Sequence, residues 1–212
     1  MTEACPLCKG HTITPYHQDE RREYLECEAC KLVFVPKKFH LDAALEKAQY
    51  DLHENDPNDV NYRKFLSKIY TPLNALLKPN SKGLDFGSGP GPTLSLLFKE
   101  AGHKMDIYDI FYAPNKNVLK GGYDFITATE VVEHLSSPMQ VLDMLWGLVK
   151  PGGYLGLMTQ FNEGVDFKNW HYKIDPTHIC FFKPETFGKL TKKWEAEISF
   201  SPPNSVIFQK SV

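Results

Sequence analysis

The sequence lacks an excess of charge of either sign, and it lacks a long run of apolar residues. Lysine and arginine together number 24 against 26 aspartates and glutamates, so the formal net charge is −2. Binding to nucleic acid or to an anionic membrane requires a basic excess, so neither partner is expected. No apolar run approaches the length of a membrane span, and the first residues lack the basic and apolar regions of a signal peptide. We therefore expect a cytoplasmic protein.

Cysteine is scarce, and four of the five cysteines fall into two pairs of the form Cys-x-x-Cys. The pairs are Cys5/Cys8 and Cys27/Cys30, separated by residues 9–26. Disulfides are not expected in a reducing compartment, whereas two such pairs can complete a tetrahedral zinc site. Four thiolates leave no open position for water, so this zinc would be structural. The alternatives are a chance arrangement and a redox dithiol.

Residues 1–40 resemble a zinc ribbon, with a hairpin across residues 16–25 and a closing strand at residues 31–35. Many zinc ribbons bind nucleic acid, but this segment contains equal numbers of basic and acidic residues. Phosphate binding favours a clear basic excess. We therefore expect the ribbon to pack on the rest of the chain or to help cover its substrate.

The stretch Gly83–Pro92 predicts a buried strand that runs into a glycine turn and then into a helix. Glycines occupy every second position from Gly87 to Gly91, and they let a ligand approach the backbone where a Cβ would block it. A dinucleotide site has the spacing Gly-x-Gly-x-x-Gly, but Pro92 takes the last of these positions. Asp85 repels a pyrophosphate and suits a cationic ligand such as S-adenosylmethionine. The alternative is a plain glycine turn in another kind of α/β protein.

Residues 85–91 and three later features resemble the class I S-adenosylmethionine-dependent methyltransferases, whose first motif is Asp/Glu-x-Gly-x-Gly-x-Gly. Asp109 ends a predicted strand at residues 104–109. Glu130–His134 is similar to the Glu-Val-x-Glu-His segment of small-molecule methyltransferases, such as those of ubiquinone biosynthesis. A helix then meets a strand through Lys150–Gly153, a join typical of the family. The resemblance implies a doubly wound, mainly parallel, Rossmann-like α/β sheet that closes with an antiparallel hairpin at residues 197–210.

The resemblance also implies that S-adenosylmethionine is the cofactor. A carboxylate about twenty residues after such a glycine turn commonly accepts hydrogen bonds from ribose hydroxyls, which is the role expected of Asp109. The alternative is a solvated loop aspartate. The residues expected to bind the cofactor are Asp85, Phe86, Gly87, Ser88, Gly89, Gly91, Asp109, Ile110, Phe111, Thr129 and Glu130.

The region after Asp109 departs from the family. Residues 110–123 are too few for the helix, strand and loop that a usual class I domain places there. We expect the third strand and its helices to be reduced or missing, with Phe111 and Tyr112 as substitutes that stack on adenine. Residues 41–82 predict two amphipathic helices around a turn at residues 53–59. These helices are either a lid over the substrate or packing helices without substrate contact.

A long aromatic connection spans residues 160–183, and long loops at the active end of an α/β sheet are usually functional. We expect Trp170 and Tyr172 to border the acceptor pocket beside a cluster of possible general bases. The catalytic candidates are His134, His171, Asp175 and His178. Three interpretations stay open for the cluster: acid/base catalysis or substrate positioning, which we favour, then a hydrogen-bonded scaffold, and a metal site of His171, Asp175 and His178.

The sequence thus predicts a zinc ribbon at residues 1–40, a helical lid or linker at 41–82, and an S-adenosylmethionine-binding domain at 83–212. The favoured function is methyl transfer to a small-molecule acceptor, a sugar- or quinone-like metabolite. One alternative is an RNA-modifying methyltransferase that uses the ribbon for recognition, which the neutral ribbon disfavours. The other is a non-catalytic protein that binds the cofactor or a partner.

Overall fold

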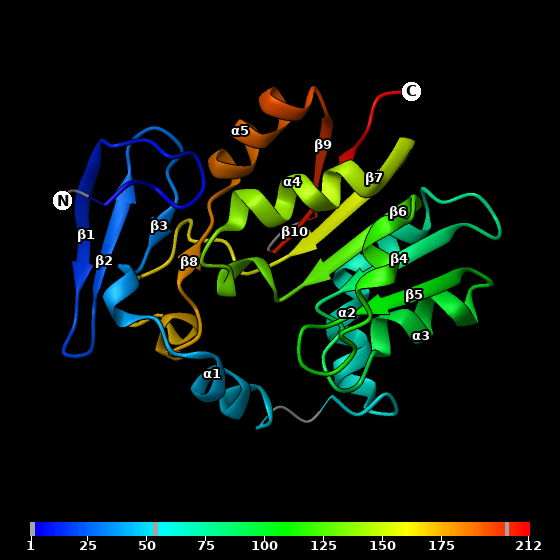
Figure 1. The fold of residues 1–212 in the computed structure, drawn as a ribbon, viewed down its shortest axis with the longest axis horizontal. Coiled ribbons are helices and arrows are strands. Elements are labelled where there is room, and N and C mark those ends of the chain that lie inside the picture. The colour runs from blue at the N-terminus through cyan, green and yellow to red at the C-terminus, as the bar shows by residue number, and fades with distance from the viewer. Residues whose placement is uncertain (1–2, 53–54, 202–203) are drawn as a thin grey trace.

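A computed structural model describes residues 3–52, 55–201 and 204–212. Two sheets organise the chain, a small one formed mainly by the N-terminal ribbon and a larger one surrounded by helices (Figure 1). Two predicted turns lie partly outside the described residues. They are the turn at residues 53–59, of which 53–54 are not described, and the turn of the hairpin at residues 197–210, of which 202–203 are not described.

The larger sheet has six strands in the order β5-β4-β6-β7-β10-β9. The strands β4, β5, β6 and β7 run parallel, and β10 is antiparallel to both of its neighbours. The prediction of a mainly parallel α/β sheet with a closing antiparallel hairpin is therefore confirmed. The bounds are β4 (Lys82–Phe86), β5 (Lys104–Tyr108), β6 (Tyr123–Thr129), β7 (Val149–Met158), β9 (Glu197–Ser201) and β10 (Ser205–Gln209).

No strand follows β5 before β6, and β5 is consequently the edge of the sheet within the described chain. Residues 110–122 form an isolated bridge between Asp109 and Ala113 and a short 3-10 helix, η2 (Lys116–Lys120). The predicted reduction of the third-strand region is confirmed. The join at Lys150–Gly153 differs from the prediction, because β7 already begins at Val149 and includes these residues as an irregularity in its pairing with β6.

Helices cover both faces of this sheet (Figure 1). On one face, α2 and α3 pack together, and α2 buries Leu66, Ile69 and Leu73 against Ile207 and the neighbouring strands. On the other face, α4 and α5 cover Val206 and Phe208, because successive side chains of a strand point to opposite faces. The bounds are α2 (Val60–Asn74), α3 (Thr93–Glu100), α4 (Pro138–Leu148) and α5 (Pro184–Trp194).

Helix α1 (Ala43–Tyr50) differs from the others because it has no buried residue. The Asp42 carboxylate caps it by accepting hydrogen bonds from the backbone N–H groups of Ala44 and Leu45. The helix lies between the ribbon and the larger sheet (Figure 1). Of the two interpretations of residues 41–82, packing fits most of α2, whereas the exposure of α1 fits a lid.

The small sheet has the order β1-β2-β3-β8 and is antiparallel throughout. Its first three strands are β1 (Ile13–Gln18), β2 (Glu23–Cys27) and β3 (Val33–Phe34), as the ribbon pattern predicts. The fourth, β8 (Cys180–Phe181), belongs to the aromatic connection, far away in sequence. A single buried cluster accordingly runs from the ribbon through this connection to the α4 face of the larger sheet.

Substitution of Gly83 tests how closely β4 packs against β5 and β6. A Cβ at this position would lie 2.3 Å from the Phe125 ring and 2.6 Å from the Met105 sulfur. We expect Gly83→Ala to lower the free energy of unfolding by about 1–3 kcal/mol, the usual range for an overfilled core. Urea unfolding followed by circular dichroism measures this change.

Gly188→Ala is the matched control, because Gly188 lies inside α5 and a Cβ there meets nothing within 4 Å. This substitution should stabilise the protein by up to about 1 kcal/mol through helix propensity. Equal stabilities of the two variants would contradict the packing described for β4.

Candidate functional site

The carboxyl ends of the parallel strands β4, β5 and β6 border a cavity of about 840 Å³. The structure brings every residue predicted for cofactor binding or catalysis to its wall. These residues are Asp85, Phe86, Gly87, Ser88, Gly89, Gly91, Asp109, Ile110, Phe111, Thr129, Glu130, His134, His171, Asp175 and His178. Their individual roles stay predictions.

The glycine turn after β4 is bound to the end of β5. Gly87 donates its N–H to the Tyr108 carbonyl at 2.7 Å, and both Gly87 and Gly89 have positive φ angles, of 73° and 62°. Such angles favour glycine. A Cβ at Gly91 would lie 1.9 Å from the carbonyl oxygen of Asn55, so this part of the chain packs directly on the turn.

The Asp109 side chain is buried and accepts hydrogen bonds from the backbone of two turns, so it is not a solvated loop aspartate. Its Oδ2 accepts the Gly89 N–H at 3.0 Å, and its Oδ1 accepts the N–H groups of Phe111 and Tyr112 at 2.8 and 3.0 Å. A carboxylate has about four lone-pair sites, so capacity for a ligand hydroxyl remains. The same carboxylate therefore fixes the turn and can contact a ribose.

Asp85 is a buried carboxyl group without a cationic partner among the described residues. The hydroxyls of Thr127 and Ser95 donate to it at 2.8 and 3.3 Å. Burial raises the pKa of Asp85 from 3.8 to about 6, and these hydrogen bonds only partly offset that effect. A bound cation would stabilise the ionised form and lower the pKa again.

Three polar side-chain atoms on the cavity wall are buried without a hydrogen-bond partner in the described chain. They are Ser88 Oγ, Thr129 Oγ1 and Glu130 Oε1. Buried polar groups in proteins are nearly always hydrogen-bonded. Together with the glycine turn, which keeps Cβ atoms away, these orphaned atoms fit a polar ligand of the kind that S-adenosylmethionine represents.

The wall beside the shortened region is apolar. Ile110 and Phe111 line it together with Leu119 and Val131. The side chain of Ile110 is 69% exposed despite its apolar character. Removal of this surface from water would favour a flat ligand group such as adenine.

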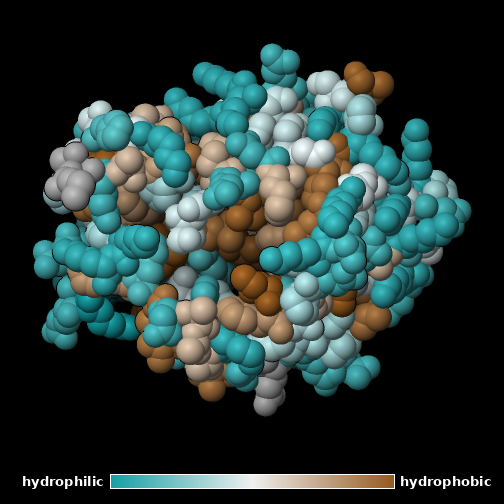
Figure 2. Space-filling view, viewed as in Figure 1, coloured by the Kyte–Doolittle hydropathy of each residue, from teal (hydrophilic) through white to brown (hydrophobic). Residues whose placement is uncertain are grey.

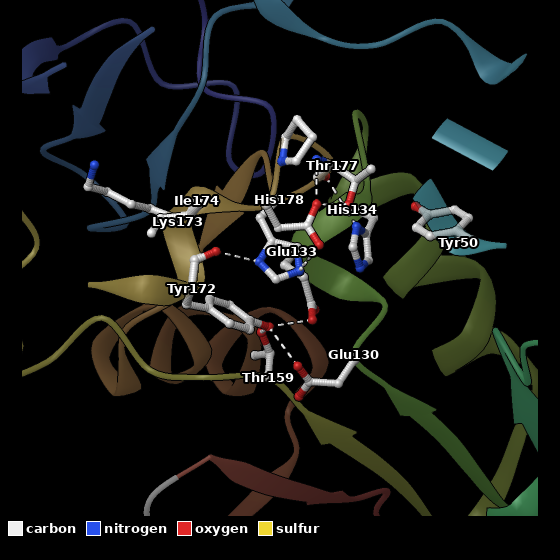
Figure 3. A network of polar contacts seen from close by, with 12 residues as sticks. Tyr50, Glu130, Glu133, His134, Thr159, Tyr172, Lys173, Ile174, Thr177 and His178 are labelled. Atoms are coloured by element: carbon white, nitrogen blue, oxygen red, sulfur yellow. Dashed lines mark hydrogen bonds and ion pairs between the residues drawn. The ribbon is translucent and has the colours of Figure 1, made fainter. Parts of the chain in front are cut away.

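Two glutamates after β6 share one tyrosine hydroxyl (Figure 3). Tyr172 lies within hydrogen-bond distance of Glu130 Oε2, at 3.1 Å, and of Glu133 Oε1, and the Thr159 hydroxyl lies 3.1 Å away. One phenolic proton cannot serve two carboxylates at once. Burial first, and then the charge of Glu133, raise the pKa of Glu130 well above its ordinary value, which favours the protonated form of Glu130.

His134 and His178 both face this pair (Figure 3). His134 Nδ1 lies 3.1 Å from the Thr177 carbonyl, and His178 Nδ1 lies 2.7 Å from the Tyr172 carbonyl. Carbonyl oxygens only accept, so each Nδ1 carries a proton. Burial lowers the pKa of His134 to about 4, which keeps its ring neutral near pH 7.

The metal interpretation requires a correction. Among the described residues, His171, Asp175 and His178 do not form a metal-ligand group, because their ligand atoms do not all lie within 4.8 Å of one another. The ligand atoms of Glu133, His134 and His178 instead lie within 4.8 Å of one another, so this set can hold a cation. The prediction for Trp170 is also wrong, because its ring packs against Phe181 and does not line the cavity.

The sequence interpretation missed Glu133, Tyr50 and Asn55. Glu133 was visible as the second acidic residue of the Glu130–His134 segment, but nothing in the spacing gave it a role. Tyr50 reaches the cavity from α1, with its ring centroid 5.2 Å from that of His134. No local sequence pattern predicts that a side chain of α1 reaches this cavity.

A family profile described as a methyltransferase domain matches residues 59–198, well over half of the chain. The chain belongs to this methyltransferase-domain family. Ubiquinone biosynthesis O-methyltransferases also match. That of Shewanella pealeana is 31% identical over 85 residues, 40% of this chain and 36% of that protein, and that of Dechloromonas aromatica is 32% identical over 80 residues, 38% and 34% respectively. This chain spans about a third of the length of these relatives.

Solved methyltransferases share the fold. The 1,6-didemethyltoxoflavin-N1-methyltransferase of Burkholderia thailandensis, with its substrate and S-adenosylhomocysteine bound, is 15% identical with a TM-score of 0.56, covering 93% of this chain and 99% of that one. Magnesium protoporphyrin IX methyltransferase of Synechocystis PCC 6803, with S-adenosylmethionine bound, is also 15% identical. Its TM-score is 0.51, covering 80% and 92% of the two chains. At this identity the likeness shows the fold alone.

The ribbon lies outside the part of the chain that the methyltransferase-domain profile matches. Its four paired cysteines have their sulfur atoms within 4.8 Å of one another, with distances of 3.5 Å for Cys5–Cys30 and for Cys8–Cys27. Tetrahedral zinc at its usual bond length to sulfur separates the sulfur atoms by about 3.8 Å. The donor set therefore fits the predicted structural zinc. Within the described residues, no helix combines the length and apolar character needed to cross a membrane.

We expect a single zinc ion to copurify with each chain when no metal is added. Cys27→Ser should abolish this binding and unfold the ribbon, because so small a unit depends on its metal. Cys180→Ser is the control, since Cys180 is a buried thiol outside the cluster. Elemental analysis of the three proteins tests the prediction, and a metal-free ribbon that remains folded would refute it.

Proposed function

We propose that this protein transfers the methyl group of S-adenosylmethionine to a small-molecule acceptor. The observation that carries the proposal is that the glycine turn, Asp109, Glu130 and His178 all line the same cavity at the ends of β4, β5 and β6. Carboxyl ends of parallel strands are the usual ligand side of such sheets. Membership of the methyltransferase-domain family and the shared fold support the same conclusion.

Asp85, Asp109 and the glycine turn would bind the cofactor. Asp85 offers a buried carboxylate without a cation partner, which suits the ammonium of the amino-acid end. The remaining lone pair on Asp109 suits a ribose hydroxyl, and Ile110 and Phe111 supply the apolar wall for the adenine. When bound, S-adenosylmethionine supplies an electrophilic methyl group on a sulfonium.

The charge of the cavity restricts the acceptor. Glu46, Asp85, Asp109 and Asp175 line it, whereas no lysine or arginine among the described residues does. Phosphate groups are normally bound by such basic side chains. We therefore propose an acceptor without phosphate, which disfavours both RNA and nucleotide-linked sugars.

A hydroxyl acceptor requires a group that takes its proton. The neutral ring of His134 retains an Nε2 lone pair, and Asp175 lies 3.7 Å from His178 Nε2, where it can stabilise the charged ring of His178. We propose these histidines as the base and the positioning group, with Tyr172 and Glu130 in contact with the acceptor. The ubiquinone O-methyltransferases among the relatives act on a hydroxyl by name, and the rings of Tyr50, Phe111 and Tyr172 suit a quinone-like metabolite.

The pKa of Asp85 gives a pH test of cofactor binding. In the free protein the raised pKa favours the protonated carboxyl, so the stability that Asp85 contributes is full below pH 3.8 and is lost as the pH rises through about 6. A cationic ligand prefers the ionised form. Affinity for S-adenosylhomocysteine should therefore fall as the pH drops below about 6, by up to about tenfold per pH unit.

Asp85→Asn keeps the shape of the side chain and removes the titrating group. Calorimetry should show weaker binding than wild type near neutral pH and a flatter profile toward pH 5. Glu130 remains in both proteins, so the difference between the profiles isolates Asp85. The same slope in both proteins would exclude Asp85 as the group that faces the ligand cation.

The activity itself is tested by transfer of labelled methyl groups to a metabolite extract, with an RNA fraction alongside. Label should appear in small molecules only. His178→Asn should lower turnover by about a hundred- to ten-thousand-fold, the range for loss of a general base, while S-adenosylhomocysteine still binds. His11→Asn, at an exposed ribbon position, is the control for histidine replacement.

Activity assays with a metal chelator distinguish proton transfer from cation binding at Glu133, His134 and His178. Activity that survives exhaustive chelation supports the histidines as acid/base groups. Activity that is lost on chelation while the four ribbon cysteines keep their zinc, and that is restored by a divalent ion, would assign them as ligands instead. Label in RNA alone would overturn the small-molecule proposal.

A further inference from the structure

The ribbon holds the segment that carries Tyr172, Asp175 and His178. The turn between β1 and β2 reaches across to residues 173–176, which include the end of the 3-10 helix η4 (His171–Ile174). The residue at the centre of this contact is Arg22, whose side chain is only 7% exposed.

The guanidinium of Arg22 is bonded to three carbonyls of this segment. Its Nη2 donates to the carbonyls of Lys173 and Asp175 at 2.7 and 2.9 Å, and its Nη1 donates to that of Pro176 at 3.2 Å. Its Nε donates to the Tyr24 hydroxyl at 3.0 Å. Only the planar fork of an arginine can bond to several acceptors in this way.

A buried ion pair lies next to this fork. Lys173 donates to Asp19 at 2.6 Å, and the Tyr24 hydroxyl donates to the same carboxylate at 3.1 Å. Lys173 is 6% exposed, so the pair is shielded from the solvent that weakens surface ion pairs. The ribbon thus fixes both the backbone and one side chain of the segment before His178.

The ribbon also fixes the chain after His178. Val35 donates its N–H to the Ile179 carbonyl at 2.9 Å, and β3 pairs with β8 directly afterwards. The Ile179 N–H in turn donates to the Glu133 carbonyl at 2.8 Å. His178 is therefore placed between two ribbon contacts, one on each side of it in sequence.

We infer that Arg22 is a positioning residue, through which the N-terminal ribbon sets the geometry of the acceptor half of the cavity while leaving the cofactor half independent. This inference rests on the proposed function. Arg22 does not line the cavity, so it acts through the carbonyls of residues 173–176. The Tyr172 carbonyl, which accepts from His178 Nδ1, immediately precedes these carbonyls in sequence. The cofactor half is built from β4, β5 and Asp109, which the Arg22 contacts do not include.

The test compares Arg22→Gln with Arg21→Gln. Arg21 is the adjacent, exposed arginine, and it donates to a single carbonyl of the same segment, that of Ile174. In Arg22→Gln, hydrogen exchange at residues 172–179 should accelerate by about tenfold or more, as expected when buried hydrogen bonds are lost locally. In Arg21→Gln it should stay close to wild type.

Two further measurements distinguish positioning from general support. Affinity for S-adenosylhomocysteine should change by less than about twofold in Arg22→Gln, as expected for independent sites. Nitrogen-15 spectra of the histidine rings at constant pH should show the His178 Nδ1–H tautomer in wild type and a mixed tautomer in the variant. The ring of His103, which contacts Asn74 on the far face, should not change.

Arg22→Lys is the second variant in case Arg22→Gln does not fold. It keeps the buried charge, but its single nitrogen lacks the planar fork that spaces the donors of a guanidinium across three carbonyls, so the segment should still loosen while β4 and β6 stay protected from exchange. Unchanged exchange and tautomer in a folded Arg22 variant would overturn the inference. Equal losses in the segment, in β4 and in S-adenosylhomocysteine affinity would also overturn it. If wild type fails to bind S-adenosylhomocysteine, the proposed function fails, but the exchange data still report on the ribbon contact.

Discussion

The carboxylate of Asp109 is the interaction on which the ligand side of the sheet depends. It joins the turn after β4 to the turn after β5 by accepting three backbone N–H groups, from Gly89, Phe111 and Tyr112. The turn after β5 has no following strand to support it, because the usual third-strand region is reduced to residues 110–122. A buried carboxylate that accepts several backbone N–H groups can replace such support. The two turns that border the cavity are therefore held in place although no strand lies beyond β5 in the described chain.

The acceptor half is organised by a different constraint, the burial of two glutamates beside one tyrosine hydroxyl. Glu130 takes a positive φ of 52° at the end of β6, a conformation that few residues other than glycine adopt. Such strain persists only where the surroundings enforce it. Here they include Tyr172, which is in turn fixed by the segment that the ribbon holds. The end of β6, the aromatic connection and the ribbon thus stabilise one another around the two glutamates and Tyr172.

Sequence reasoning succeeded where the determinants are local. The strand, the glycine turn and the helix within Gly83–Gly102 depend on residues close together in the chain. The same holds for the paired cysteines and for the shortened region after Asp109. The residues of the cavity wall could be predicted because they lie at the ends of the predicted strands. It failed for long-range contacts. Arg22 and Lys173 lie 151 positions apart, and no local pattern relates them. It also failed for Trp170, because an aromatic composition does not tell a ring that faces a cavity from one that faces the core.

The acidic cavity also bears on how the two forms of the cofactor would be distinguished. Methyl transfer removes the positive charge of the sulfonium, while the carboxylates around it stay in place. A wall that carries carboxylates and no lysine or arginine among the described residues stabilises a sulfonium more than a neutral sulfur at the same position. The electrostatic part of binding therefore favours S-adenosylmethionine over its demethylated product. A cavity lined with lysine or arginine would reverse this discrimination, because its positive potential would oppose the sulfonium and leave the neutral product almost unaffected.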